Sequence, residues 1–452
     1  MHRLHHRRVV PGQRRKATGF LIIVLILLVA QSPGFRFLVM LPSHVRLNDG
    51  EAMPVPELLP LVGVYTDAGF LQVEKERTMA AGTGDTGGVE IRSTGTGQST
   101  LEFRLLGILP VRRVAVDVVA PLRVMPGGQS IGVMAREKGV TVVGLPVVVG
   151  PDGQRYSPAR DAGIETGDVI LSIDGEPIES EEQVSLLVRK AGTEGRPCEI
   201  VLRRGGRELT VKVTPVLDAT GANYMIGIYI RGATAGVGTL SFWDPVTGVF
   251  TALGHIITDS DTNRVVDVAE GYILPAVISA VEPGRRGQPG GKIGTFSFAD
   301  PPLGKIERNT QFGIVGRLSH PLKNGIADEP VNLGMAVEVR PGPAQMLTVI
   351  NGQTVQSFNI EIERVIPQAE PGDKGLVLRV TDPVLLEKTG GIIQGMSGSP
   401  ILQDGRLVGV VTHVMINDPT RGYGIYAEWM AANAGLLGNG AENTTFERIV
   451  AA

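Results

Sequence analysis

Residues 395–400 form the sequence Gly-Met-Ser-Gly-Ser-Pro, a short turn built around a serine. Ser397 stands between Gly395 and Gly398, and glycine permits backbone angles that other residues avoid and lets another chain approach closely. A serine hydroxyl is a weak nucleophile unless a base accepts its proton and nearby N–H groups stabilise the oxyanion. A tight turn of this composition can supply those N–H groups, but the same six residues also fit an ordinary Gly/Ser turn.

The next residues, 401–412, have the sequence Ile-Leu-Gln-Asp-Gly-Arg-Leu-Val-Gly-Val-Val-Thr. The apolar runs on both sides of Asp404 and Gly405 are typical of a β-hairpin with a two-residue turn. A nucleophile turn followed by a hairpin resembles the second barrel of chymotrypsin-like serine proteases. This resemblance favours a catalytic role for Ser397.

The composition points to a β-rich protein of several domains. The chain has 452 residues, with Gly 60, Pro 30 and only 5% aromatic residues, which favours turn-rich β structure over helical bundles. The net charge of −3 gives no reason to expect a nucleic acid partner. Cys198 is the one cysteine, which excludes an intrachain disulfide, and its apolar neighbours predict a buried core position.

The N-terminal region is typical of an exported protein. Residues 1–16 carry six basic residues and no acidic one, and residues 20–30 are an unbroken apolar run. A basic flank before an apolar core indicates a secretion signal or a membrane anchor with the basic end inside. We therefore predict a cytoplasmic N-terminus over residues 1–16 and a transmembrane anchor or signal segment over residues 17–41. No small-x-small cleavage motif follows the run, which favours an uncleaved anchor.

Residues 42–100 are predicted to be a flexible linker. The first part is rich in proline, and residues 80–100 are dominated by glycine, threonine and serine. Such a composition buries too little apolar surface to offset the entropy lost on ordering.

A PDZ domain is predicted within residues 101–217, together with strands that precede it. Residues 162–178, Ala-Gly-Ile-Glu-Thr-Gly-Asp-Val-Ile-Leu-Ser-Ile-Asp-Gly-Glu-Pro-Ile, resemble the PDZ signature. One face of a helix follows, with helical spacing of Val184, Leu187, Val188 and Ala191. PDZ domains bind an extended peptide at a sheet edge beside such a helix. By resemblance, the loop that receives a peptide carboxylate consists of Ser130, Ile131, Gly132 and Val133.

Residues 218–452 are predicted to form the peptidase domain. Short apolar segments alternate with Gly/Pro turns to about residue 427, and a helical pattern appears only near residues 428–437. This pattern fits a β-barrel or paired barrels. The chain is thus predicted to be mainly β, with a PDZ domain followed by a chymotrypsin-like double β-barrel.

The base for Ser397 must come from a short set of histidines, because an unperturbed imidazole titrates near neutral pH. His255 follows a glycine that leaves room for a substrate, so it is the favoured base, and His413 at the end of the hairpin is its main rival. His44 precedes the linker and His320 precedes a proline, which makes both poor candidates.

The acid that orients the base is left open by spacing alone. Asp382 lies fifteen residues before Ser397 and gives the chain order His, Asp, Ser, whereas Asp259 lies four residues after His255 and is also a typical turn residue. The chain has no His-Glu-x-x-His motif or cysteine cluster, and residues 259–263 lack the glycine and glutamate of a calcium loop. We therefore expect no metal or other cofactor.

These features together resemble the stage IV sporulation protein B peptidase family over residues 101–428. The resemblance rests on the N-terminal apolar run, the PDZ signature, Ala-Leu-Gly-His at 252–255 and Ile-Ile-Gln-Gly-Met-Ser-Gly-Ser-Pro at 392–400. It implies a catalytic triad of His255, Asp382 and Ser397, with Thr412 in a supporting role. The backbone N–H groups of Gly395 and Ser397 are expected to stabilise the oxyanion.

The resemblance also implies a biological role. Enzymes of this family are exported from the forespore into the space between its two membranes. There they cleave themselves and the extracytoplasmic part of a membrane complex that regulates an intramembrane protease. We therefore expect a membrane-anchored serine endopeptidase whose partners are protein substrates, itself included. The alternative is a non-catalytic PDZ scaffold with a degenerate barrel.

Overall fold

The computed structural model describes residues 30–55, 62–75, 89–297, 299–368 and 370–437, together with positions 20, 24 and 28. Residues 1–16 and most of the predicted anchor up to residue 29 lie outside this set. A helix α2 (Pro33–Met40) follows. None of the helices formed by the described residues is long and apolar enough to cross a membrane.

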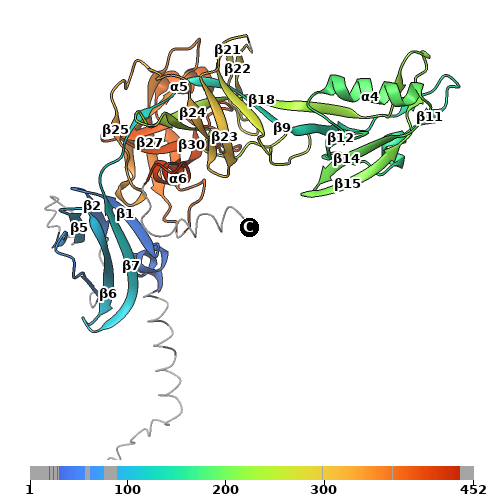
Figure 1. Ribbon diagram of the computed structural model, residues 1–452. Coiled ribbons are helices and arrows are strands. Elements are labelled where there is room, and N and C mark those ends of the chain that lie inside the picture. Colours follow the sequence, from blue (N-terminus) through green and yellow to red (C-terminus); the bar gives the residue numbers. More distant parts are fainter. Residues whose placement is uncertain are drawn as a thin grey trace, which may run out of the picture. The chain divides into compact units, whose positions relative to one another are not determined.

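The chain divides into two compact units, and the first comprises residues 1–121, 334–340 and 366–372. It contains two small sheets around a core that includes Ile91, Leu101, Phe103 and Val114 (Figure 1). One sheet has the order β1 (His44–Asn48), β7 (Leu109–Val119), β6 (Gly97–Leu105) and β3 (Val62–Tyr65). The other has the order β2 (Ala52–Val55), β5 (Val89–Ser93) and β4 (Leu71–Lys75).

The prediction of a flexible linker over residues 42–100 is therefore wrong for its described parts. Residues 56–61 and 76–88 lie outside the described set, but the rest largely forms strands. Apolar side chains such as Leu71, Ile91 and Leu101 are buried at alternating strand positions, which the average Gly/Thr/Ser composition conceals. Residues 101–119 also belong to this unit and not to the PDZ domain.

The first barrel of the second unit is a closed ring of six strands around a core that includes Ile131, Leu240, Phe250 and Ile314. Two long strands, β9 and β18, pair antiparallel over most of their length and extend from this barrel into the PDZ domain (Figure 1). In order around the ring the strands are β9 (Ser130–Gly144), β20 (Glu270–Pro275), β23 (Gly304–Thr310), β24 (Gly313–Leu318), β19 (Val249–Ala252) and β18 (Tyr229–Trp243).

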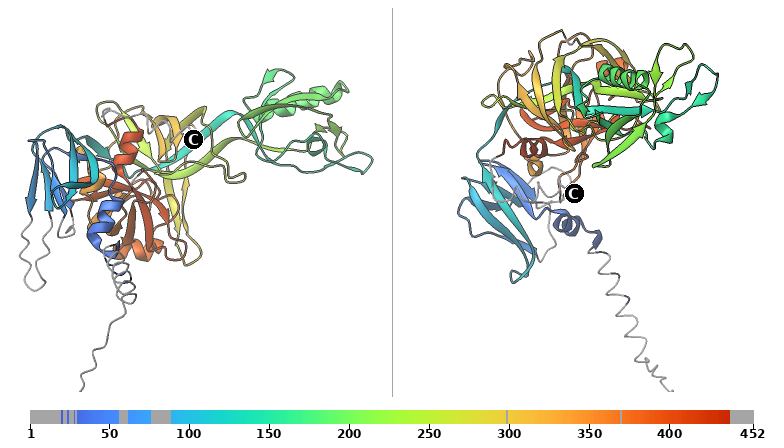
Figure 2. Two further views of the ribbon diagram at one scale, coloured as in Figure 1. Left: turned by 90° about the horizontal axis from the view of Figure 1, so that it is seen from below. Right: turned by 45° about the vertical axis from the view of Figure 1, so that its right-hand side comes forward.

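The second barrel is also closed and contains the predicted hairpin. Its strands in order are β26 (Gly342–Thr348), β27 (Gln356–Val365), β28 (Leu376–Val380), β31 (Arg421–Tyr426), β30 (Arg406–Val414) and β29 (Pro400–Gln403). Asp404 and Gly405 have φ of 51° and 76°, as a two-residue hairpin turn with positive φ requires. Helices α5 (Pro383–Thr389) and α6 (Ala427–Asn433) complete it, and Figure 2 gives two further views.

The PDZ domain uses the outer halves of β9 and β18. They join β12 (Val169–Ile173), β14 (Cys198–Arg204) and β15 (Arg207–Val213), and helix α4 (Glu181–Thr193) packs on them. The predicted helix face is buried, and so is Cys198. Burial raises the pKa of the Cys198 thiol to about 11. The predictions of a mainly β fold, paired barrels and a PDZ domain are confirmed.

The predicted carboxylate loop is wrong. Ser130, Ile131, Gly132 and Val133 begin β9 and are buried inside the first barrel. This segment pairs with residues 236–239 of β18 on one edge, and its residues 131–133 pair with β20 on the other, so it cannot accept a peptide. Its glycine serves packing, because a Cβ at Gly132 would lie 2.2 Å from the Phe296 ring.

Candidate active site

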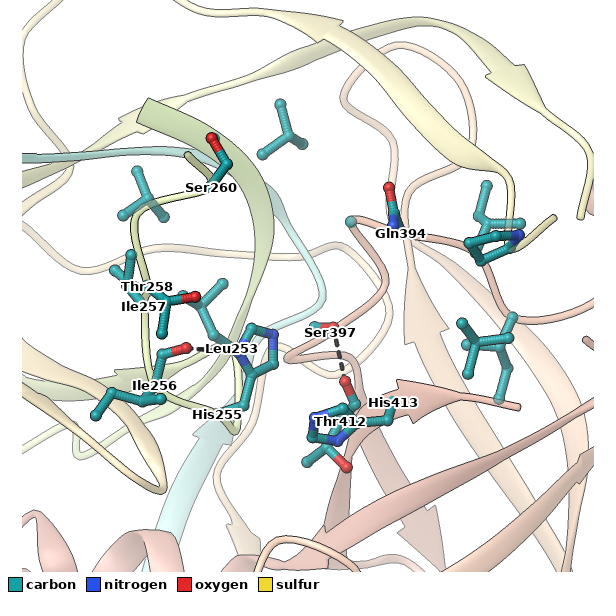
Figure 3. Close-up of a pocket in the computed structure, with 18 of the residues that line it drawn as sticks. Leu253, His255, Ile256, Ile257, Thr258, Ser260, Gln394, Ser397, Thr412 and His413 are labelled. Carbon is teal, nitrogen blue, oxygen red and sulfur yellow. Dashed lines mark hydrogen bonds between the residues drawn. The ribbon is translucent and has the colours of Figure 1, made fainter. Parts of the chain in front are cut away.

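A cavity of about 550 Å³ is lined by residues of both barrels, and Ser397 lies in its wall (Figure 3). The first barrel contributes β18 residues 234–237 and the loop that follows β19, from Leu253 to Ser260. The second barrel contributes the turn before β29 and the end of β30. The two barrels thus bring together side chains that are more than a hundred residues apart in the chain.

The Ser397 turn depends on two glycines with positive φ and on a hydrogen bond to β30. Gly395 and Gly398 have φ of 88° and 98°, and a Cβ at Gly398 would lie 2.0 Å from the carbonyl oxygen of Thr239. The Gly398 N–H donates to Val411 at 2.8 Å. Gly395 is therefore required for its backbone conformation. Gly398 is required both for its conformation and for the close approach of the Thr239 carbonyl.

Two N–H groups of this turn have no acceptor among the described residues, and they belong to Gly395 and Ser397. The carbonyl preceding each is bound: Gln394 O accepts from Lys292 N, and Met396 O accepts from Ser399 N, both at 2.9 Å. In a trans peptide the N–H points opposite to the C=O, so neither N–H points toward these internal donors. These are the two N–H groups that are predicted from the sequence to stabilise the oxyanion.

His255 is presented to the cavity by an unusual backbone. Leu253 and Gly254, directly after β19, both have positive φ, of 71° and 74°. Nδ1 of His255 lies 2.9 Å from the carbonyl oxygen of Ile256. Because a carbonyl only accepts, Nδ1 carries the proton and Nε2 keeps the free electron pair that a general base needs. Figure 3 shows the imidazole beside Ser397.

His413, the rival base, lines the same cavity. Its ring centroid lies 5.5 Å from that of His255. Burial lowers the pKa of His413 and the adjacent His255 lowers it further, so His413 stays neutral to lower pH than an exposed histidine. Its Nδ1 lies 3.8 Å from Oδ2 of Asp373, which is too long for a hydrogen bond.

Thr412 connects the serine to the barrel. Its carbonyl accepts the Ser397 hydroxyl at 2.8 Å, and its own hydroxyl donates to the Asp373 carbonyl at 2.9 Å. Sequence reasoning expected a supporting role for Thr412, and the contact is through its backbone carbonyl. Asp373 was missed, because nothing in its sequence context distinguishes it from an ordinary loop aspartate.

The structure does not place Asp382 with the histidine. Its carboxylate caps helix α5, with Oδ1 accepting from the Val384 and Leu385 N–H groups at 3.0 and 3.1 Å. Oδ2 accepts from the Asn359 N–H at 3.3 Å. An aspartate before a proline is typical of a helix N-cap, and this is the role that Asp382 has.

Asp259 is also engaged away from His255. Its carboxylate accepts from the N–H groups of its own turn and pairs with Arg231 at 3.0 Å. These bonds hold the pKa of Asp259 below its usual value against the opposing effect of burial. No group of three or more His, Cys, Asp or Glu residues in the described parts of the chain could hold a metal ion.

The sheet edge of the PDZ domain that has no strand partner in the described part of the chain also differs from the sequence prediction. Among the described residues, 229–231 of β18 pair with β9 on one edge and with no strand on the other, and helix α4 contacts β18. Gly227, with φ of 75°, forms the turn before this edge, between Ile226 and Ile228. This Gly between two isoleucines is the signal in the sequence that could have identified the edge. The same strand continues into the first barrel and lines the cavity at residues 234–237.

Comparison with known proteins agrees with a chain that contains a PDZ domain and a peptidase domain. Residues 222–431 match the family model described as SpoIVB peptidase S55, and residues 152–204 match a PDZ domain. The chain is 39% identical over 59 residues to "Serine protease HTRA1" of Xenopus laevis, which is 13% of this chain and 12% of that protein. It is 34% identical over 110 residues to "Putative zinc metalloprotease mll0638" of Mesorhizobium japonicum, which is 22% of this chain and 29% of that protein. The chain thus spans less than a third of the length of these relatives.

Proposed function

Since residues 222–431 belong to the SpoIVB peptidase S55 family, the chain carries a serine peptidase domain, and we propose that it is an exported endopeptidase that cleaves protein substrates, itself included. One observation carries this proposal. Ser397 shares a cavity with His255, and its own turn contains two backbone N–H groups that have no acceptor in the described part of the chain.

In the proposed mechanism, Ser397 Oγ attacks the scissile carbonyl while Nε2 of His255 accepts the hydroxyl proton. The N–H groups of Gly395 and Ser397 bind the oxygen that becomes negative. His255 then donates the proton to the leaving amine, and a water molecule repeats the sequence to release the acyl group. The Ile256 carbonyl takes the place of the acid, because it fixes the tautomer and accepts a hydrogen bond from the imidazolium.

The hydroxyl of Ser397 has to turn before reaction. In the resting arrangement it donates to the Thr412 carbonyl and not to a histidine. Catalytic hydrogen bonds are often formed only once substrate is bound, so this arrangement is compatible with a peptidase. A substrate that displaces the hydroxyl from Thr412 would direct it toward His255.

The family supports a role in sporulation signalling. We propose that the enzyme acts in the forespore intermembrane space, attached to the membrane by its N-terminal segment. Its target there would be the extracytoplasmic part of a complex that regulates an intramembrane protease. The PDZ edge on β18 would hold a peptide on the same strand that lines the cavity.

The test compares Ser397→Ala with Ser399→Ala in the purified full chain. Ser399 is buried two residues away, and its hydroxyl makes no hydrogen bond in the described part of the molecule, so it is a matched control. We expect the first variant to lose casein hydrolysis and self-cleavage, measured by mass spectrometry of the products, and the second to keep both. Unchanged cleavage by Ser397→Ala would refute the assignment.

The second candidate function is a peptide-binding scaffold without activity. It is favoured by the absence, among the described residues, of a carboxylate bonded to His255. A fluorophosphonate probe separates the two functions, because it reacts only with an activated serine. Labelling of the wild type that disappears in Ser397→Ala would exclude the scaffold.

A further inference from the structure

A lysine lies behind the Ser397 turn, on the hairpin formed by β21 (Val277–Glu282) and β22 (Gly291–Thr295). This lysine, Lys292, is partly exposed as a whole residue, but its amino group is enclosed by the protein. Nζ donates to the hydroxyls of Ser130, Thr239 and Thr348 at 3.1, 3.3 and 3.0 Å. An ammonium group has three N–H donors, and these three buried hydroxyls satisfy all of them.

One of the three hydroxyls continues to the turn itself. Thr239 Oγ1 donates to the carbonyl oxygen of Gly395 at 2.8 Å. Because its oxygen already accepts from Lys292, its single hydrogen is free for this bond. The hydrogen bonds therefore all donate in one direction, from the Lys292 ammonium to the Thr239 hydroxyl and from that hydroxyl to the Gly395 carbonyl.

The backbone of Lys292 holds the adjacent peptide. Its N–H donates to Gln394 O at 2.9 Å, and the Gln394 N–H donates to Gly290 O at 3.2 Å. The Lys292 stem lies 3.1 Å from the position of a Cβ on Gly395, so only glycine fits there without displacement. The carbonyls of Gln394 and Gly395 are thus both held on the lysine side of the turn.

We propose that Lys292 is a positioning residue that acts through Thr239 to fix the Gly395–Met396 peptide, which lies between the two peptides that carry the Gly395 and Ser397 N–H groups. This inference rests on the proposed peptidase function. The preceding Gln394–Gly395 peptide is held separately, because its carbonyl accepts from the main-chain N–H of Lys292, so the Gly395 N–H in that peptide points the opposite way. Lys292 itself touches no reacting atom and acts only through the turn.

The network also makes the turn sensitive to pH. Burial lowers the pKa of Lys292 to about 7. The groups that face Nζ from β9, β18 and β26 are hydroxyls, and no charged side chain in the described residues lies within hydrogen-bonding distance of it. A neutral amine has two donors and one acceptor, so one hydroxyl must then donate to it. When Thr239 does so, the Gly395 carbonyl loses its donor.

The experiment measures the rate at which a fluorophosphonate labels Ser397 in the full chain. Thr239→Val removes the hydroxyl while keeping the shape, and Thr239→Ser keeps it. We expect Thr239→Ser to react within about threefold of the wild type and Thr239→Val about tenfold more slowly, since losing an oxyanion donor outright costs about 10²–10³. Equal rates in the two variants would overturn the inference.

A pH profile gives a second test that a purely structural role would not affect. We expect the wild-type rate to fall between pH 7 and 9, the fall to be absent in Lys292→Met, and the exposed control Lys305→Met to keep it. A fall that persists in Lys292→Met, or no fall in the wild type, would refute the proposal. Should the wild type react at no pH, the peptidase function fails as well, whereas failure of the variants alone leaves that function intact.

Discussion

Replacing Lys292 with methionine should change how stability depends on pH. The ordinary value of 10.5 applies to the unfolded lysine, and burial lowers the folded pKa to about 7. Between these two values the unfolded chain binds more protons than the folded one, so the free energy of unfolding rises with pH. Below pH 7 the lysine is charged in both states and contributes no slope.

The size of the effect follows from the shift. One pKa unit corresponds to about 1.36 kcal/mol, so a shift of about 3.5 units gives up to about 5 kcal/mol over the window and about 3 kcal/mol by pH 9. Lys292→Met lacks this gain, since methionine does not titrate. The hydroxyls that it leaves without a donor change the stability by an amount that is constant with pH. The difference in slope between the two proteins therefore isolates the lysine.

Urea unfolding followed by tryptophan fluorescence measures this difference. The two tryptophans of the chain, Trp243 and Trp429, lie in β18 and α6, so the signal reports on the peptidase barrels. We expect the wild type to gain stability over Lys292→Met between pH 7 and 9, and the exposed variant Lys305→Met to follow the wild type. Parallel curves for wild type and Lys292→Met from pH 6 to 9 would refute the reasoning.

Three further predictions concern the site. Asp382→Asn keeps a cap oxygen and should leave casein hydrolysis within a few-fold, while Asp382→Ala should cost about 1 kcal/mol in urea unfolding; a loss of about 10⁴ in rate for the Asn variant would instead restore it to the triad. His255→Ala should lower hydrolysis by about 10³ or more and His413→Ala by less than about tenfold, and the reverse order would exchange their roles. Gly398→Ala should lower the melting temperature far more than Gly405→Ala, because both have positive φ but only the first meets backbone, at 2.0 Å; equal losses would mean that strain alone matters.

The sequence predicted best where a pattern has one structural meaning. The Asp-Gly hairpin after Ser397 was predicted correctly because two residues with positive φ between apolar runs favour one turn type. The buried face of α4 was predicted because helical spacing defines it directly. The cavity brings together Ser397, His255 and Thr412, which were singled out from turn composition, a small set of histidines and family resemblance.

Prediction from the sequence failed where pairing between distant segments decides the role of a residue. Ser130 to Val133 has the composition of a PDZ loop, yet its partners are strands about a hundred residues later or more. The edge without a strand partner among the residues that the structure describes lies instead at residues 229–231, after Gly227. Which strand is left at an edge is a property of the whole sheet, so the Ile-Gly-Ile pattern around Gly227 could be recognised in the sequence but not preferred over residues 130–133 on composition alone.

The structure does not bring the predicted acid, Asp382, to His255, and the physical reason is a different one. A carboxylate that caps a helix and one that orients a histidine both accept N–H hydrogen bonds, so the residue type alone is compatible with either role. Asp382 caps the helix with two backbone donors and accepts a third hydrogen bond from the Asn359 N–H, while His255 bonds the Ile256 carbonyl. Every residue has a carbonyl, so this partner leaves no trace in the sequence. A neutral carbonyl stabilises an imidazolium less than a carboxylate does, so the proposed oxyanion turn, and the buried lysine behind it, would have to supply a larger share of the rate.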